Sequence, residues 1–473
     1  MEYISTRGSA PTLDFEGVTL AGLAADGGLY LPREWPHFSA EEIRSLRGLS
    51  YADLAARVMQ PFVEPALSGE QLRAICHEAY GEFGHAAVTP LVQLDAQNWL
   101  LELFHGPTLA FKDVALQLLG RFFETFLDRR GERLTIVGAT SGDTGSAAIR
   151  AVAGLDRVEI FMLHPQGRVS DVQRRQMTTV RAPNVHNLAI DGSFDDAQAH
   201  VKRMFADEAI NGPLSLGAVN SINWARLMAQ VVYYFASALQ LGAPDRAVAY
   251  SVPTGNFGDI FAGYVAQKMG LPVERLIVAT NVNDILHRAL TSGDYSAGEV
   301  TRTHTPSMDI QVSSNFERLL FDCGGRDGVA MAEQMRGFER ARAMQLTNAQ
   351  REGAAALFVS RRADQDETAR ALQWAWRHAG QVIDPHTAVG LHASLSCSLE
   401  EAVEPGTPLV TLATAHPAKF PEAVERAIGV RPSLPGRVGD LFAREESFTE
   451  LPGDYEASRD FVLSRALADP ATG

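Results

Sequence analysis

The chain of 473 residues has few cysteines, no excess of positive charge and no long apolar run. Its three cysteines, Cys76, Cys323 and Cys397, lie far apart and form no C-x-x-C pair, so the sequence offers neither a disulfide framework nor a cysteine metal site. The formal net charge of −15 argues against nucleic acid or an anionic membrane as the main partner. An uninterrupted apolar window of roughly eighteen residues is missing, which argues against a membrane span.

The start of the chain also lacks the pattern of a secretory signal, because residues 1–15 include acidic side chains and no apolar core. Together with the dispersed cysteines, this predicts a cytoplasmic protein with buried thiols. The composition, 46% hydrophobic and 21% charged, is ordinary for a globular protein, and the length allows two or three domains. Composition alone therefore predicts no activity.

After a mixed segment of about 88 residues, short β-branched runs alternate with helical patterns. Such alternation is typical of βαβ units and a parallel sheet, in which ligands bind at the carboxyl ends of the strands. We expect strands at 133–139, 157–163, 247–253, 275–280 and 408–414, and helices at 146–155, 170–180, 259–270, 283–290 and 421–429.

Two glycine-rich loops follow expected strands. The first, "TSGDTGS" (140–146), combines hydroxyls and glycines that leave N–H groups free for an anion, but it has neither the lysine of a P-loop nor the spacing of a dinucleotide fingerprint. A tight turn capped by its own hydroxyls explains it equally well. In the second, "TGNFGD" (254–259), the glycines allow a sharp turn whose amides converge on one oxyanion at a helix start. The alternative there is a helix capped by Asp259.

Two further clusters carry hydrogen-bond donors. Asn220, Ser221 and Arg226 lie around another loop-to-helix junction and would suit a phosphate or carboxylate, although a surface arginine with a capping serine is the simpler interpretation. Thr414 stands at the end of the strand in "PLVTLATAHPAKF", where its hydroxyl can meet a ring nitrogen, although threonine is also an ordinary strand residue.

The stretch "HGPTLAFKD" (105–113) places Lys112 directly after an apolar run, which predicts an inward-pointing lysine. A shielded amine loses its charge readily and can form a Schiff base with a carbonyl cofactor. Pyridoxal 5'-phosphate requires such a lysine, a site for its phosphate and donors for its ring. The lysine and the glycine-rich loops together favour this cofactor.

A set of motifs in the same order resembles the threonine synthases. The motifs are "HGPTLAFKD", "GATSGDTGSAA", "NSINWAR", "VPTGNFGDIFAGY", "MDIQVSSNFERLLF", "DPHTAVG" and "ATAHPAKF". The N-terminal stretches "YISTRG" and "DGGLYLP" narrow the resemblance to the longer bacterial and fungal branch, and it spans about residues 3–430. The resemblance implies a fold-type-II enzyme with two doubly wound α/β domains around the cofactor and an N-terminal α/β segment. On that basis we expect an N-terminal domain at 1–88, a large domain at 89–134 and 240–473, and a small domain at 135–239.

The resemblance also implies roles for individual residues. Lys112 matches the Schiff-base lysine, and Asp143 stands where a side chain contacts the cofactor's phenolic oxygen, which leads us to expect a shared proton there. Thr414 is the best match for the hydroxyl at the pyridine nitrogen, with Thr411 a weaker candidate. The cofactor phosphate would lie on Gly255, Asn256, Phe257, Gly258 and Asp259, and the substrate would contact Ser141, Thr144, Asn220, Ser221 and Arg226.

The implied reaction converts O-phospho-L-homoserine and water to L-threonine and phosphate by β,γ-replacement, the last step of threonine biosynthesis. One alternative is a phospholyase that uses the same cofactor and releases a keto acid, ammonia and phosphate; another is a non-catalytic ligand-binding protein with the same fold. His77 and His85 lack a third partner, so we expect no metal. We expect no nucleic-acid or membrane partner, and a monomer or weak homodimer.

Overall fold

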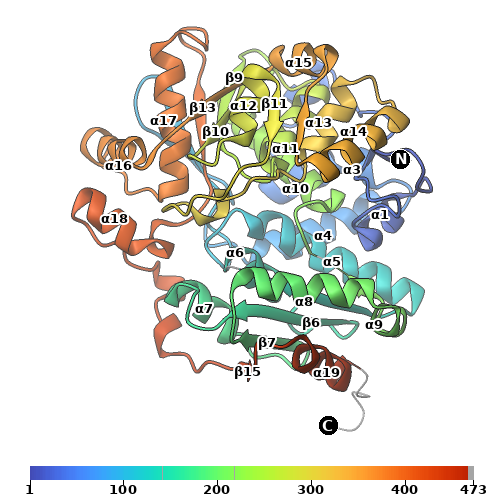
Figure 1. Ribbon diagram of the computed structural model, residues 1–473. Helices are drawn as coiled ribbons and strands as arrows, with labels where there is room; N and C mark the ends of the chain where they lie inside the picture. The colour runs from blue at the N-terminus through green and yellow to red at the C-terminus, as the bar shows by residue number, and fades with distance from the viewer. Residues whose placement is uncertain (141, 218, 467–473) are drawn as a thin grey trace. The chain divides into compact units, whose positions relative to one another are not determined.

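The computed structural model describes residues 1–140, 142–217 and 219–466, which form two compact units. The large unit consists of residues 1–18, 23–111 and 221–433, and the small unit of residues 19–22, 112–220 and the C-terminal part from 434. The division passes through helix α1 (Phe15–Ala21). Figure 1 labels the elements.

A six-stranded sheet forms the centre of the large unit, with the strand order β13-β10-β9-β14-β4-β3. All neighbouring strands are parallel except β3, which pairs with β4 in the antiparallel sense. Every residue of β9 and β14 is buried, as expected for parallel strands covered on both faces. The bounds are β3 (Leu91–Gln93), β4 (Asn98–Glu102), β9 (Val248–Pro253), β10 (Val273–Thr280), β13 (Phe358–Arg362) and β14 (Leu409–Ala413).

Helices cover both faces of this sheet (Figure 1). Consecutive residues of β9 point to opposite faces and contact helices on either side. Ala249 packs in one cluster with Val389 and Ala393 of α17, whereas the next residue, Tyr250, meets Tyr234 of α10 at a ring distance of 4.8 Å. The helices on and around the sheet are α10 (Trp224–Gln240), α11 (Gly258–Lys268), α12 (Ile285–Ser292), α13 (Phe316–Cys323), α14 (Gly328–Ala341), α15 (Asn348–Ala355), α16 (Gln365–Ala379), α17 (Pro385–Leu399) and α18 (Pro421–Ile428), with short 3₁₀ turns η1 (Pro306–Met308) and η2 (Pro417–Lys419). Strands β11 (Asp294–Ser296) and β12 (Ala343–Gln345) form a separate antiparallel pair.

The N-terminal region packs within the large unit. The ring of Trp224, on α10, lies 5.9 Å from Tyr3 and 5.7 Å from Phe62, so aromatic side chains join the region to the helix. Its elements are the antiparallel pair β1 (Tyr3–Ser5) and β2 (Tyr30–Pro32), followed by α2 (Ala40–Ser45), α3 (Tyr51–Val63) and α4 (Gly69–Gly81).

The small unit contains a five-stranded parallel sheet with the order β15-β7-β6-β5-β8. On one face, Phe161 and Leu163 of β6 pack with residues of α8, α9 and α19. Its other helices include α5 and α6, which approach so closely that a Cβ on Gly120 would lie 2.2 Å from the carbonyl oxygen of Ala151. The elements are α5 (Lys112–Arg130), β5 (Leu134–Ala139), α6 (Asp143–Val152), β6 (Val158–Pro165), α7 (Asp171–Thr178), β7 (Val185–Ile190), α8 (Phe194–Ala206), α9 (Glu208–Leu214), β8 (Leu216–Gly217), η3 (Gly436–Val438), η4 (Leu441–Ala443), β15 (Thr449–Leu451) and α19 (Tyr455–Ala466).

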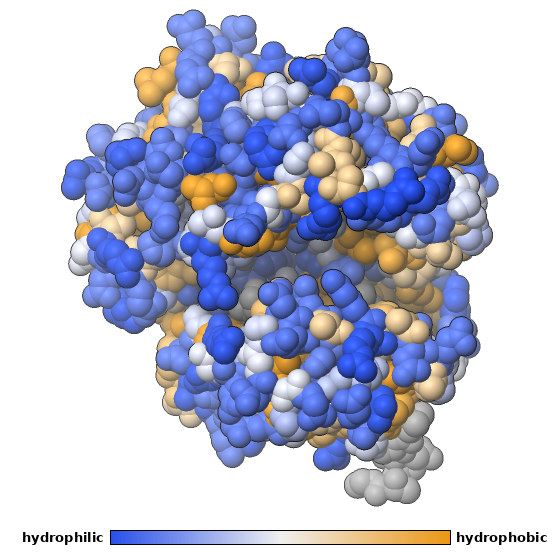
Figure 2. Space-filling model, viewed as in Figure 1, coloured by the Kyte–Doolittle hydropathy of each residue, from blue (hydrophilic) through white to orange (hydrophobic). Residues whose placement is uncertain are grey.

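The alternation predicted from the sequence is confirmed. The five expected strands correspond to β5, β6, β9, β10 and β14, and the five expected helices to α6, α7, α11, α12 and α18, with ends that differ by a few residues. The division into three domains stays a prediction. Within the described ranges, no helix is long and apolar enough to cross a membrane. On the face that Figure 2 shows, hydrophilic residues cover most of the surface and hydrophobic ones are scattered among them.

Candidate active site

The backbone that leads to Lys112 is bound to the carboxyl end of β14. The N–H of Phe111 donates to the carbonyl of Thr414 over 2.8 Å, and the N–H of His416 donates to the carbonyl of Leu109 over 3.0 Å. The buried ammonium of Lys419 donates to the carbonyl of Thr108 over 2.7 Å. Leu109 is fully buried and has a φ of 62°, a conformation that a leucine rarely adopts outside a well-packed turn. These contacts fix where the chain enters α5, at Lys112.

The side chain of Lys112 is only 13% exposed, and its Nζ lies 3.5 Å from Oδ2 of Asp143. Asp143 is buried at the start of α6, and its Oδ1 accepts a hydrogen bond of 2.8 Å from Nε2 of Gln173. A Cβ on Gly142 would lie 2.5 Å from Cδ of Gln173, so only glycine allows this close approach. The carboxylate is thus held between an amide and the amine of Lys112.

Within the loop that precedes α6, Thr140 supplies the cap. Its Oγ1 accepts the N–H groups of Gly142 and Gly145 at 3.0 and 2.9 Å, so the simpler interpretation of this loop as a capped turn holds for these two donors. Thr144, predicted to bind substrate, lies half-buried in the first turn of α6. Ser141, predicted for the same role, lies outside the described residues.

The loop formed by residues 255–259 joins β9 to α11 and presents a row of backbone donors. Phe257 has a φ of 62° and is the residue before the helix, which turns the chain sharply. Within the described part of the chain, no protein acceptor takes the N–H group of any of the five residues. Consecutive N–H groups at a helix start form an anion site. A Cβ on Gly255 would lie 2.9 Å from the carbonyl oxygen of Ser307, so a larger residue does not fit without a shift.

Asp259 contributes to this loop through its backbone and not through its carboxylate. The carboxylate is buried and accepts hydrogen bonds from the hydroxyls of Tyr233 and Tyr234 on α10, so it does not cap α11. Burial raises the pKa of Asp259 to about 7, against the opposing effect of the two tyrosine hydroxyls. Its side chain therefore anchors the first turn of α11 to α10.

The segment before α10 brings some of the predicted substrate-binding residues together. The hydroxyl of Ser221 lies 3.4 Å from that of Ser314, and Asn223 caps the helix by accepting the N–H of Ala225 at 3.0 Å. Arg226 lies in the first turn of α10 and is 2% exposed, so it is no surface arginine; burial lowers the pKa of its guanidinium to about 10. Asn220 is exposed and belongs to the small unit.

Of the two candidate threonines, Thr414 stands at the better position. It follows the last residue of β14, at the edge where ligands of parallel sheets bind. Thr411 lies inside the strand, fully buried, and its methyl group would be 3.0 Å from a Cβ on Gly390 of α17. Thr411 therefore packs against a helix in the core.

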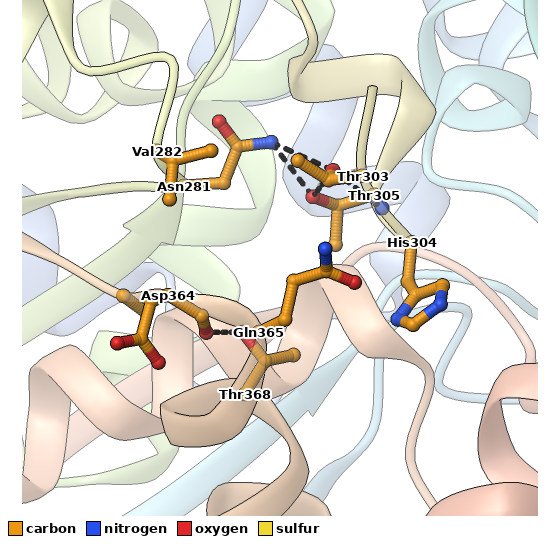
Figure 3. Close-up of a pocket in the computed structure, with 9 residues that line it drawn as sticks. Asn281, Val282, Thr303, His304, Thr305, Asp364, Gln365 and Thr368 are labelled. Atoms are coloured by element: carbon orange, nitrogen blue, oxygen red, sulfur yellow. Dashed lines mark hydrogen bonds between the residues drawn. The ribbon is translucent and has the colours of Figure 1, made fainter. Parts of the chain in front are cut away.

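A small cavity is lined by residues of 281–282, 303–305 and 363–368 (Figure 3). Its volume of about 10 Å³ matches roughly one water molecule, which excludes the substrate. The amide of Asn281 donates to the hydroxyls of Thr303 and Thr305 at 3.1 and 2.8 Å, as Figure 3 shows, and to Asp309 at 2.8 Å. This network fixes the segment that carries Ser307.

These groups fit pyridoxal phosphate: a shielded lysine, a row of backbone donors for a phosphate, and a hydroxyl at a strand end. Family models match the chain as threonine synthase N terminus over residues 2–80, as pyridoxal-phosphate dependent enzyme over 83–360, and as threonine synthase C-terminal over 387–462. The chain belongs to the threonine synthase family. It is 55% identical to the threonine synthase of Pseudomonas aeruginosa over 98% of each chain.

Solved structures of this family have the same fold. The crystal structure of PLP-bound threonine synthase from Brucella melitensis has a TM-score of 0.96 and 53% identity to this chain, and the match covers 99% of this chain and 100% of that one. The threonine synthase from yeast has a TM-score of 0.93 and 39% identity over 98% of each chain. The fold-type-II assignment is thereby confirmed, and the protein is a PLP-dependent lyase of the threonine synthase family.

Three side chains that support the predicted site residues were not predicted from the sequence. Gln173 binds Asp143, and Ser313 and Asn315 bind the carbonyls of the 255–259 loop. Ser313 and Asn315 stand in the motif "MDIQVSSNFERLLF", which belongs to the family resemblance but for which the sequence alone predicts no individual roles. The individual roles of the predicted site residues stay predictions.

Proposed function

We propose that the protein converts O-phospho-L-homoserine and water to L-threonine and inorganic phosphate. The observation that carries the proposal is the row of N–H groups at 255–259, none of which has a protein acceptor within the described ranges. The shielded amine of Lys112, 3.5 Å from Asp143, agrees with it. Membership of the threonine synthase family supports the choice of substrate over other phosphate esters of amino acids.

When bound, pyridoxal phosphate supplies a conjugated ring that spreads the negative charge left when protons leave the substrate carbons. The amine of Lys112 removes the proton from Cα of the substrate and later returns a proton to Cα. Asp143, which is itself held by Gln173, holds that amine in place. The N–H groups of residues 255–259 bind the phosphate of the cofactor. A neutral hydroxyl at Thr414, in place of a carboxylate, favours elimination and replacement over transamination.

In this proposal the substrate phosphate is bound by Arg226, Ser221 and Asn220. A guanidinium that is already desolvated needs no further reorganisation when charge develops on the departing phosphate. A proton leaves Cβ, the bond between Cγ and the phosphate oxygen breaks with its electron pair going to the phosphate, and Cγ gains a proton. Water then adds its hydroxyl to Cβ, and its remaining proton goes to the released phosphate. Thr144 and Ser141 complete the proposed set of substrate contacts.

The variant Lys112→Ala tests the proposal directly. We expect loss of the imine absorption of the purified protein and loss of turnover, whereas Lys268→Ala, which removes an exposed lysine on α11, retains both. Product analysis by mass spectrometry decides between threonine with phosphate and a keto acid with ammonia. Turnover by Lys112→Ala would refute the assignment of the lysine, and keto acid as the main product would replace the synthase by a phospholyase.

Further features of the proposal follow from the sequence. We place the protein in the cytoplasm, as a monomer or weak homodimer without nucleic-acid or membrane partners, and retain the domains 1–88, 89–134 with 240–473, and 135–239. Size-exclusion chromatography with light scattering tests the oligomeric state. Limited proteolysis with mapping of the first cuts tests the domain limits.

A further inference from the structure

Arg318, in α13, is a fully buried arginine whose hydrogen-bond acceptors are all neutral. Its Nε and Nη2 donate to the carbonyl of Tyr30 at 2.9 and 2.8 Å, Nη2 also donates to the carbonyl of Ile222 at 2.6 Å, and Nη1 donates to the side-chain oxygen of Asn315. Burial lowers the pKa of this guanidinium to about 9, against the opposing charge of its neighbour Glu317. Burying a cation against neutral oxygens is unfavourable for folding, and such a cost is consistent with a role in ligand binding.

The arginine determines which way the amide of Asn315 points. A guanidinium only donates, so the atom of Asn315 that faces it must be the oxygen. The amide nitrogen therefore faces the other way, where it donates to the carbonyl of Asn256 at 3.0 Å and to the carbonyl of Ser221 at 3.3 Å. The backbone N–H of Asn315 reaches the same Asn256 carbonyl at 3.0 Å. Asn315 thus joins the 255–259 loop to the segment that precedes α10.

Holding these carbonyls orients the N–H groups of the loop. In a trans peptide unit the carbonyl and the following N–H point in opposite directions. The carbonyl of Gly255 accepts a hydrogen bond of 2.6 Å from Ser313, so the N–H of Asn256 points away from Ser313. The carbonyl of Asn256 is held by Asn315, so the N–H of Phe257 points away from Asn315. The N–H groups of Asn256 and Phe257 therefore both point away from the segment that contains Ser313 and Asn315.

The N-terminal region completes the surroundings of Arg318. The carbonyl of Tyr30 in β2, 288 positions earlier in the chain, takes two of its hydrogen bonds. The neighbouring residue, Glu317, accepts from the hydroxyl of Thr6 at 2.5 Å and pairs with Arg7 at 3.2 Å. Without the N-terminal region, the buried cation would lose its main acceptor.

We propose that Arg318 is a positioning residue for the phosphate of the cofactor: through Asn315 it orients the N–H groups of the 255–259 loop, and it adds a buried positive charge behind them. The N-terminal region serves this site by supplying the carbonyl of Tyr30. The inference rests on the proposed function only in assigning the 255–259 loop to the cofactor phosphate.

The test compares the affinity of the apoprotein for pyridoxal phosphate and for pyridoxal, which lacks the phosphate. For Arg318→Met we expect the dissociation constant for pyridoxal phosphate to rise at least about tenfold, which corresponds to 1.4 kcal/mol, and that for pyridoxal to stay within about twofold. Arg318→Lys retains the charge but not the planar set of donors, so its dissociation constant for pyridoxal phosphate should lie between those of wild type and Arg318→Met.

Arg326→Met is the matched control. Arg326 also binds carbonyls of the N-terminal region, those of Pro32 and Arg33, but it pairs with Asp322 and does not contact Asn315. We expect this variant to lower the melting temperature of the apoprotein and to leave the affinity for pyridoxal phosphate unchanged. Equal losses for both cofactor forms in Arg318→Met, or the same loss in Arg326→Met, would reduce Arg318 to a structural role and overturn the proposal.

If Arg318→Met does not fold, Ser313→Ala and Asn315→Ala decide, because each removes only a few atoms from the supports of the loop. Both variants should weaken the binding of pyridoxal phosphate more than that of pyridoxal. An unchanged ratio of the two dissociation constants would overturn the proposal. Since the readout is cofactor affinity, the outcome is independent of the reaction product. A protein that binds pyridoxal phosphate in this way and makes no threonine would refute the proposed function and leave this inference intact.

Discussion

Gly255→Ala is the substitution whose effect on the cofactor site follows most directly from distances. The added methyl group would lie 2.9 Å from the carbonyl oxygen of Ser307 and 3.5 Å from Cα of Met308. Both are backbone atoms, and the network of Asn281 and Asp309 holds their segment in place, so the neighbour has little room to move. The 255–259 loop must then shift by several tenths of an ångström.

Overpacking of this kind typically destabilises by about 1–3 kcal/mol. If the strain is relieved by moving the loop, the same free energy appears as weaker cofactor binding, a rise of about 5- to 150-fold in the dissociation constant. The assay is titration of the apoprotein with pyridoxal phosphate, followed by fluorescence quenching, with the melting temperature of the apoprotein measured beside it.

Gly337→Ala provides the matched control for Gly255→Ala, since a Cβ at Gly337 inside α14 meets nothing within 4 Å. It should leave cofactor affinity unchanged. Wild-type affinity in Gly255→Ala, with a normal melting temperature, would show that the loop does not form the phosphate site as described. A large loss in the control would show that the assay reports general stability.

Further predictions concern stability. Gly337→Ala should stabilise the protein by up to about 1 kcal/mol because alanine loses less entropy in a helix, and urea denaturation at one pH checks this. The pKa of Asp259 is raised from 3.8 to about 7, so its contribution to stability is fully present below pH 3.8 and is lost as the pH rises through 7. The stability of Asp259→Asn relative to wild type should therefore increase from pH 5 to pH 8, by about 1.4 kcal/mol for each pH unit up to pH 7. An equal difference at pH 5 and pH 8 would contradict the buried carboxyl. Burial lowers the pKa of His164, although a backbone hydrogen bond at Pro165 opposes the shift. Wild-type stability should therefore fall as the pH drops below 6.5, and His164→Phe should weaken that fall in denaturation curves at pH 5 and 7.5.

The sequence was informative where the signal is local. Each predicted strand and helix depends on a run of neighbouring residues, and the run "AVAYSVP" followed by "TGNFGD" is sufficient to indicate a strand, a turn and a helix start. β7 and β13 carry polar and charged residues among the apolar ones, as in "VHNLAI" and "FVSRR", and were not predicted. Pairing with β6 and β10 makes them strands, and such pairing leaves little mark on a short sequence window.

The site shows the same limit more sharply. Asp259 looks like a helix cap in its own window, yet its carboxylate is bound by Tyr233, 26 positions away. Ser313 reaches the loop across 58 positions and Arg318 reaches Tyr30 across 288. No periodicity in one sequence connects such pairs. The sequence predicts candidate ligand contacts from local motifs, whereas the residues that hold those candidates in place are visible only once the chain is folded.

This limit bears on the N-terminal region, for which the sequence offered no activity. A region that only covered the sheet of the large unit would be expected to use apolar contacts such as those of Trp224, and truncating it would lower stability alone. The region also gives its Tyr30 carbonyl to a cation that orients Asn315. Its presence is therefore coupled to the affinity for a phosphate that it need not touch. Substitutions in β2 that displace the Tyr30 carbonyl should therefore weaken the binding of pyridoxal phosphate and leave the binding of pyridoxal unchanged. Loss of packing alone does not produce this pattern.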